Sequence, residues 1–393
     1  MYGRIKAACM SVSALFKLAP IAAVLTSVLL LISGNALVGV VAPVRASLDG
    51  FGDLTVGLLG SAYFAGMLLG TLYTPAMVRR SGHIRAFAGF VAVLCVATAL
   101  MPVAETPALW MLSRALVGFV LAGVYAIVES WIHGAATNAN RGALYAIYQF
   151  VNFGATSIGQ LLMRVIDPRS FLSFNIGAAL SALAILPLAI TQADTPEPPR
   201  EVKLKLATFR ALSSLSLLAA LVAGICNGAS ISLGPVYALQ IGVEPQAVPL
   251  FTASIVIGSS LGVYPVGRMS DRLDRRLIMA ITMGLGAAFE IALAVWQPTG
   301  APLVGFGFLV GLTTYTLYTL ATAIANDRAE PHDMVLVSAA LLFVYCVGAI
   351  VSPALVSLEM RAFGPSALYW QNGAAHAALA AYAAWRRISS RRR

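Results

Sequence analysis

GSSLGVYPVGRMSDRLDRR, from Gly258 to Arg276, decides how the rest of the chain is interpreted. An apolar segment with two glycines ends in a short charged loop, and a second apolar segment follows at once. The loop holds Arg268, Asp271, Arg272, Asp274, Arg275 and Arg276. Burying such charges in hydrocarbon costs about 2.5 kcal/mol or more each, so the loop must lie in water. The pattern predicts a membrane hairpin.

An earlier stretch matches this one at a constant offset of 192 residues, the difference between 258 and 66. Four positions correspond in this way: Gly66, Gly70, Arg79 and Arg80 with Gly258, Gly262, Asp271 and Arg272. Asn35 and Pro43 match Asn227 and Pro235 at the same offset. Parallel repeats related by an axis along the membrane normal occur in one large transporter architecture. The sequence therefore predicts two copies of one membrane unit.

Composition supports a bilayer as the solvent. The chain has 393 residues, of which 59% are hydrophobic and 11% charged, whereas soluble domains carry about 25% charged residues. We predict an all-α integral membrane protein with twelve transmembrane helices in two pseudo-symmetric six-helix bundles. The expected spans are 18–44, 54–78, 84–104, 107–133, 141–165, 170–190, 210–240, 247–268, 275–297, 301–325, 333–358 and 364–386.

The loops predict the domain boundaries and the orientation. A polar, Pro-rich stretch divides the spans into a bundle at 1–190, a linker at 191–209, and a bundle at 210–393 that ends in a basic tail. All but five of the 26 Lys and Arg residues fall on the side of the N-terminus. By the positive-inside rule both termini are cytoplasmic. The first apolar run is too long for a signal peptide, so we interpret it as an uncleaved span.

Several classes of function are disfavoured. The net charge of +10 comes from loops and termini, with no nucleic-acid recognition motif beside it. The cysteines and histidines have no metal-ligand spacing, and no G-x-x-x-x-G-K-[ST] loop or catalytic dyad is present. We expect no metal, no cofactor, no nucleic acid and no enzymatic activity.

The charged loop resembles a known family motif. Gly267 to Arg276 is similar to the G-x-x-x-D-R-x-G-R-R loop of the major facilitator superfamily, and the resemblance covers the whole chain. It is closest to the YcaD-like branch, through Arg114-x-x-x-Gly118 running into Glu129-Ser130-Trp131 and through the stretch 82–87. Two features depart from the family: Arg79 replaces the loop acid in the first copy, and the fifth span lacks the Gly-Pro pair of antiporters. The second departure weakens drug–proton antiport.

Arg114 and Glu129 are the main charged candidates. Arg114 lies deep in a span, where an Arg by default marks a pathway or a partner; it can bind an anionic solute group, tune a proton carrier, or be purely structural. Glu129 is fifteen residues, or about 22 Å, further along the same helix, so the two cannot pair. Glu129 is either a proton carrier or an ion-pair partner of Arg79 and Arg80. The resemblance implies that Glu290 lies on the bundle periphery, where it would face lipid.

Neutral polar residues complete the predicted pathway. Span five carries a polar stripe that should face protein or water, and the resemblance places spans one, four, seven and ten around a central cavity. Such groups can orient an uncharged or weakly anionic solute, or simply bond helices together. The pathway candidates are Asn35, Tyr125, Tyr145, Gln149, Asn152, Asn227, Tyr315 and Tyr318.

A cytoplasmic gate is expected from the two loops. The resemblance implies that the loop acid packs against the start of the facing bundle's fifth or eleventh helix. Asp271 should therefore approach Asn138, Asn140 and Arg141, while Arg79 or Arg80 should pair with Glu129, Glu330 or Asp333 when that side is closed. The gate residues are Arg79, Arg80, Asp271, Arg272, Arg141 and Asp333. The pairs Gly66/Gly70 and Gly258/Gly262 predict close helix approach, either for sliding contacts between the bundles or for static packing.

The function expected is secondary active transport of a small organic solute across the bacterial inner membrane by alternating access, coupled to H+. An uncoupled facilitative carrier is the alternative mechanism. A non-transporting membrane receptor or assembly factor is the alternative class. The expected partners are the solute, H+ and anionic lipids at the cytoplasmic tail, and we expect a monomer.

Overall fold

The fold is described from a computed structural model, which covers residues 2–103, 106–137, 140–190, 205–327, 329–330 and 333–391. Every regular element in these ranges is a helix. Ten of the helical segments are long and apolar enough to cross a membrane. The protein is therefore a multi-pass, all-helical membrane protein.

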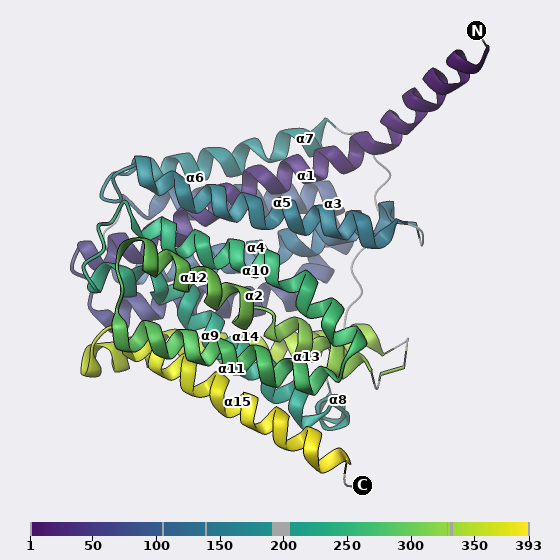
Figure 1. Ribbon diagram of the computed structural model, residues 1–393. Coiled ribbons are helices and arrows are strands. Elements are labelled where there is room, and N and C mark those ends of the chain that lie inside the picture. The colour runs from purple at the N-terminus through teal and green to yellow at the C-terminus, as the bar shows by residue number, and fades with distance from the viewer. Residues whose placement is uncertain are drawn as a thin grey trace.

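The chain runs back and forth through these helices, which lie side by side (Figure 1). The elements of the first half are α1 (Tyr2–Leu48), α2 (Asp53–Ser81), α3 (His83–Leu100), α4 (Pro107–Ala135), α5 (Arg141–Leu162), the 3-10 turn η1 (Met163–Val165), α6 (Leu172–Leu183) and α7 (Ile185–Ala189). Those of the second half are α8 (Leu206–Ala211), α9 (Ser214–Gln240), α10 (Val248–Arg272), α11 (Arg275–Trp296), α12 (Gly300–Thr314), α13 (Leu317–Asn326), α14 (Met334–Phe363) and α15 (Ala367–Arg391).

The stack of helices has two ends. We call the end at which both chain termini lie, on the right of Figure 1, the termini side. The opposite end, where α1 stops at Leu48 and α9 stops at Gln240, is the far side. The charged turn between α10 and α11 lies on the termini side, so the hairpin predicted from 258–276 is confirmed.

Two predicted spans are interrupted, and α1 begins at Tyr2, well before the predicted start at 18. Span 301–325 is broken between Thr314 and Leu317 into α12 and α13, and span 170–190 is broken at Ala184 into α6 and α7. At the first break, the hydroxyl of Thr316 donates to the carbonyl oxygen of Thr313 at 2.6 Å. This side-chain bond competes with the helical ladder, which explains a break without glycine or proline.

Buried apolar side chains form three clusters. One lies on the far side and contains residues from both halves of the chain, such as Leu37 and Val56 with Leu233 and Val356. The other two lie toward the termini side. One is built from α1–α5, α7 and Ala184 in the first half, and the other from α9, α11 and α13–α15 in the second. The halves therefore share a core on the far side and have separate cores on the termini side.

The far side is closed by a tight contact that we call the far-side seam, made by Asp53, Gly57, Gly60, Ser232, Gln240, Pro353 and Ser357. The Gln240 amide donates to the Asp53 carboxylate at 3.5 Å. A Cβ at Gly57 would lie under 3.0 Å from Pro353 and Ser357, and one at Gly60 under 3.0 Å from Ser232. The start of α2 thus packs directly on α9 and α14.

The glycine pairs of the predicted repeat lie elsewhere. A Cβ at Gly66 would meet the carbonyl of Ala115, and one at Gly70 that of Phe119, both in α4. Gly258 and Gly262 meet α12 in the same manner. The expectation of sliding contacts between bundles is therefore wrong: these glycines fix α2 on α4 and α10 on α12, because G-x-x-x-G spacing indicates close approach without identifying the partner.

Candidate functional site

Arg114 lies at the centre of the candidate site, within α4. It is 8% exposed, and its guanidinium carbon stands 4.7 Å from the centre of the Tyr63 ring of α2. Its Nη1 is buried without a hydrogen-bond partner among the residues that the structure describes. A cation over a tyrosine face is stabilised by about 0.5–2 kcal/mol, but this leaves guanidinium N–H donors available for an anion.

Glycines bring Tyr63 to Arg114. A Cβ at Gly118, one turn after Arg114, would lie under 3.0 Å from the carbonyl of Tyr63. Gly66 meets the carbonyl of Ala115 from the other helix. The two backbones can cross at this point because neither glycine has a side chain. The crossing therefore places the aromatic ring over the cation.

Tyrosines from the second half of the chain approach the same region. The rings of Tyr318 and Tyr345 meet edge to face, with centroids 5.4 Å apart. Tyr345 also lies beside Asn227 and within electrostatic range of Tyr63. α2, α9, α13 and α14 thus bring polar side chains together, among them the predicted pathway residues Asn227 and Tyr318.

Glu129 stands near the termini-side end of α4. It lies within electrostatic range of Tyr125 one turn earlier and of Tyr318 in α13. Between Arg114 and Glu129 lies a group of half-buried tyrosines that we call the tyrosine wall: Tyr63, Tyr125, Tyr318 and Tyr345. Tyr315, at the break between α12 and α13, lies within range of Tyr345. Broken helices expose backbone groups beside solute sites in transporters.

The polar stripe of α5 is distributed along that helix. Tyr145 is exposed and stacks on His133, with ring centroids 6.2 Å apart. Gln149 and Asn152 are half-buried, and the Asn152 side-chain oxygen is buried without a hydrogen-bond partner among the described groups. Asn35 in α1 is also half-buried. Their role in a solute pathway stays a prediction.

The gate residues lie on the termini side. Arg275 pairs with Asp271 at 3.2 Å and with Asp327 at 2.9 Å, which ties the α10–α11 turn to the end of α13. The Asp271 side chain is 68% exposed, so each pair contributes at most about 1 kcal/mol. Arg79, Arg80 and Arg272 are exposed, while Asp333 is half-buried.

The predicted gate contacts belong to a state in which the termini side is closed, and they stay predictions. Of the residues involved, Asn138, His332 and the side chain of Arg141 lie outside what the structure describes. Most of the linker, 191–204, also lies outside it, as do Arg328, Arg392 and Arg393.

Glu290 is placed differently from the expectation. It is 1% exposed rather than lipid-facing, and its carboxylate contacts Nδ1 of His376 at 2.7 Å. Sequence reasoning missed this partner because the two residues are 86 positions apart and on separate helices. It also missed Tyr63, although a glycine at 118 and another at 66 are the signals of the crossing that places it.

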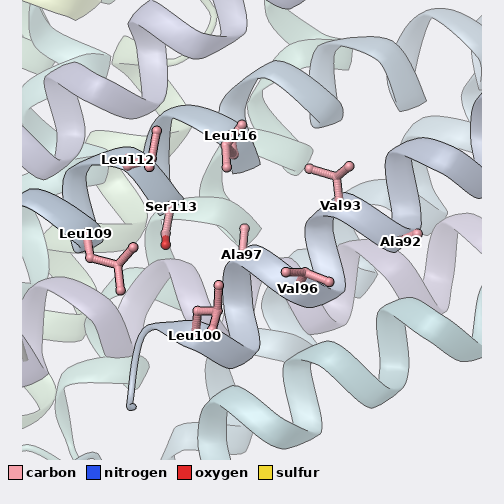
Figure 2. Close-up of a pocket in the computed structure, with 9 residues that line it drawn as sticks. All are labelled: Ala92, Val93, Val96, Ala97, Leu100, Leu109, Leu112, Ser113 and Leu116. Carbon is pink, nitrogen blue, oxygen red and sulfur yellow. The ribbon is translucent and has the colours of Figure 1, made fainter. Parts of the chain in front are cut away.

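The cavity in Figure 2 is a different kind of site. It has a volume of about 290 Å³ and lies between α3 and α4, lined by apolar side chains and Ser113. Several of its lining residues are exposed, among them Val96 and Leu112. An apolar, outward-facing groove on a spanning helix pair suits a lipid chain, since Ser113 is its one polar lining residue and no charged group lines it.

The sequence relatives of the chain are transporters. The chain is 28% identical over 355 residues to YcaD of Escherichia coli, described as an uncharacterized MFS-type transporter, and the match covers 89% of this chain and 91% of YcaD. The predicted resemblance to the YcaD-like branch is confirmed.

Solved structures share the fold. A variant of the nucleoside transporter NupG is 11% identical, with a TM-score of 0.77 over 94% of this chain and 98% of that chain. A bacterial homologue of the human lysosomal transporter Spinster, solved in an inward-facing and occupied conformation, is 17% identical, with a TM-score of 0.72 over 94% and 96%. The profile of the Major Facilitator Superfamily matches residues 24–259 and again 215–393. The chain therefore belongs to the Major Facilitator Superfamily.

Proposed function

We propose that the protein is a secondary transporter that moves a small organic solute with an anionic group by alternating access. The observation that carries this proposal is Arg114, a buried cation with an unpartnered donor beside a wall of tyrosines. Binding energy from one charge-assisted contact and several ring faces suits a planar or aromatic anion. The family membership supports transport as the class of activity.

The proposed topology has twelve spans in two six-helix bundles, at 1–190 and 210–393, joined by the linker 191–209. Ten spans satisfy length and hydropathy. α5 and α15 are the remaining two; each lies packed along apolar helices, α5 on α1 and α15 on α11. Their polar residues lower their hydropathy but are accommodated on faces that meet protein.

The proposed orientation puts the termini side in the cytoplasm of a bacterium and the far side outside its inner membrane. The basic residues of the α2–α3 and α10–α11 turns and of the C-terminal tail support this assignment. In this frame, the shared far-side core and the two separate termini-side cores correspond to a carrier that faces the cytoplasm. Alternating access then requires the far-side seam to open and the gate residues to meet.

Matched ligand pairs test the solute class. Purified protein is screened by thermal shift against aromatic carboxylates and their uncharged amides, for example benzoate and benzamide, because a binder stabilises the native state according to its Kd. Carboxylates that stabilise the protein are then assayed for flux into proteoliposomes. Stabilisation and flux by uncharged amides or nucleosides alone would refute the anionic assignment.

Two variants test the role of Arg114. Arg114→Gln removes the charge and should abolish carboxylate flux while leaving the melting temperature without ligand nearly unchanged. Arg114→Lys keeps the charge but loses the fork of donors, so it should retain weaker binding. Wild-type flux in Arg114→Gln would contradict the proposal.

Coupling to H+ is part of the proposal. Glu129 and Glu290 are the acids within the spans that can carry a proton. A solute flux that becomes faster under an imposed pH gradient, whichever its direction, supports coupling. A flux that is the same with and without the gradient supports a facilitative carrier instead.

A further inference from the structure

Glu290 of α11 and His376 of α15 form a buried acid–base pair in the second half of the chain. Each side chain is 1% exposed, and the carboxylate oxygen lies 2.7 Å from Nδ1 of the imidazole. The two helices approach closely here because Gly373 has no side chain: a Cβ there would lie 2.8 Å from Ile291. The pair is separate from the site around Arg114.

The titratable neighbours that can be named around the pair are uncharged in their ordinary forms. The electrostatic neighbours of His376 are Cys226 of α9 and Glu290 itself. Tyr369 of α15 and Tyr315, between α12 and α13, lie within electrostatic range of Glu290. The titratable groups around the pair are thus one thiol and two phenols.

The pair has unused bonding capacity. His376 Nε2 is buried without a hydrogen-bond partner among the described residues, and so is the side-chain oxygen of Asn372 one turn earlier. The Asn372 amide itself donates to Ser230 Oγ at 2.8 Å and to the carbonyl of Cys226 at 3.4 Å. α15 is thereby fastened to α9, and the Cys226 thiol lies beside the imidazole.

The net charge of such a pair makes its proton count depend on whether water can reach it. With one proton between them, a carboxyl and an imidazole have no net charge, which a dehydrated interior favours. Removing that proton or adding a second leaves a net charge that the interior disfavours unless water or a new partner arrives. A conformational change that hydrates the pair therefore changes its proton count, and the proton count in turn biases the conformation.

The pair is connected to the candidate site through two elements. On α9, Cys226 faces His376 while the next residue, Asn227, neighbours Tyr345 of the site. At the α12–α13 break, Tyr315 lies within range of both Glu290 and Tyr345. α9 also contacts α1 and α2 of the first half. A shift of α9, or of the break between α12 and α13, would therefore move residues at both the Glu290–His376 pair and the candidate site.

We propose that Glu290 and His376 form the proton-binding site of this carrier, and that proton exchange at this pair, rather than at Glu129, sets the balance between its two conformations. This inference rests on the transport function proposed above. The ligand is H+, taken up from and released to water in the state that hydrates the pair.

The test needs no knowledge of the solute. A reporter cysteine is introduced by Val236→Cys, at a side chain that is 3% exposed in the far-side core. Its reaction with a membrane-impermeant maleimide is measured against the parent protein without the reporter. At each pH the rate is divided by that of the same reporter in denatured protein, which removes the intrinsic pH dependence of the thiolate. We expect this normalised rate to change about tenfold as the pH is scanned from about 5 to about 10, a range that covers both a free histidine and one held beside a carboxylate.

Glu290→Gln and His376→Gln should each remove this pH dependence, and the matched control Glu129→Gln should keep it. The double variant with Gln at both positions keeps a neutral hydrogen-bonding pair. It replaces the single variants in the labelling test if one of them does not fold. Three results would overturn the proposal: a flat pH profile in the wild type, a wild-type profile in folded Glu290→Gln, or loss of the profile in Glu129→Gln.

Flux separates this proposal from the one on which it rests. In proteoliposomes, Glu290→Gln should exchange solute across the membrane but lose accumulation driven by a pH gradient. Absence of solute flux in the wild type would refute transport itself, whereas flux that stays driven by the gradient in Glu290→Gln would refute only the pair.

Discussion

Under the alternating access proposed above, adding one methyl group to the far-side seam should drive the protein into its other state. Gly57 sits near the start of α2, against the end of α14, where a Cβ would lie under 3.0 Å from the carbonyl oxygen of Pro353 and from the Ser357 side chain. Because the Pro353 carbonyl belongs to the backbone, it cannot rotate away as a side chain can. The change Gly57→Ala therefore forces α2 and α14 apart.

The size of the effect follows from the geometry. Ordinary contacts begin near 3.4 Å, so the helices must separate by about 1 Å, and overpacking of this kind costs about 1–3 kcal/mol. The cost falls only on the state in which the far side is closed. A bias of about 1–3 kcal/mol changes the ratio of two states by about 5- to 150-fold, so the far-side-open state should gain by that factor.

The assay is labelling of the Val236→Cys reporter from the far side, since Val236 lies beside the seam and lines a small gap with Asp53 and Ser357. Gly57→Ala should accelerate labelling by the factor above. Gly39→Ala is the matched control, because a Cβ there meets nothing within 4 Å. Unchanged labelling in a folded Gly57→Ala protein would show that the seam is equally tight in both states and would refute the reasoning.

Three further predictions follow from other contacts. Gly66→Ala should lower thermal stability by about 1–3 kcal/mol because it overpacks the α2–α4 crossing, whereas Gly89→Ala, in open space, should be neutral or slightly stabilising in the same melt. Arg79→Asp should open the termini side, measured by cysteine accessibility in α4 and α13, and added Asp333→Arg should restore closure; wild-type behaviour of the single variant would make the loop exchange incidental. Replacing the arginines of 386–393 with Gln should weaken stabilisation by anionic lipid, at about 1 kcal/mol per residue near the surface, and leave turnover in neutral lipid unchanged.

The sequence predicted the helices of this fold well because hydropathy and charged turns are local signals. The hairpin at 258–276 and its repeat needed only a run of apolar residues, two glycines and a cluster of arginines. The break at Tyr315 and Thr316 was not predictable in the same manner, because it depends on a hydroxyl bonded to the backbone rather than on a glycine or proline. Local patterns therefore locate spans better than interruptions within them.

Partnerships across the fold were harder to predict. Arg114 was singled out by its cost in a bilayer, but the ring that covers it, Tyr63, is set by a helix crossing. Glu290 was expected to face lipid because its helix belongs to the periphery, yet a helix has several faces, and the one bearing Glu290 meets His376. Which face of a helix is turned inward depends on how the helices pack together. The periodicity of residues along one helix does not reveal that packing.

α2 carries glycines at both ends of its membrane portion, and they meet different partners. Gly66 and Gly70 hold the helix on α4, while Gly57 and Gly60 rest on α9 and α14. From Gly57 to Gly70 the helix rises about 20 Å, so α2 is fixed on α4 over one part of its length and meets the second half of the chain over the other. Spin labels joining α2 to α14 should consequently report a displacement that grows toward Asp53, while labels joining α2 to α4 keep a constant separation.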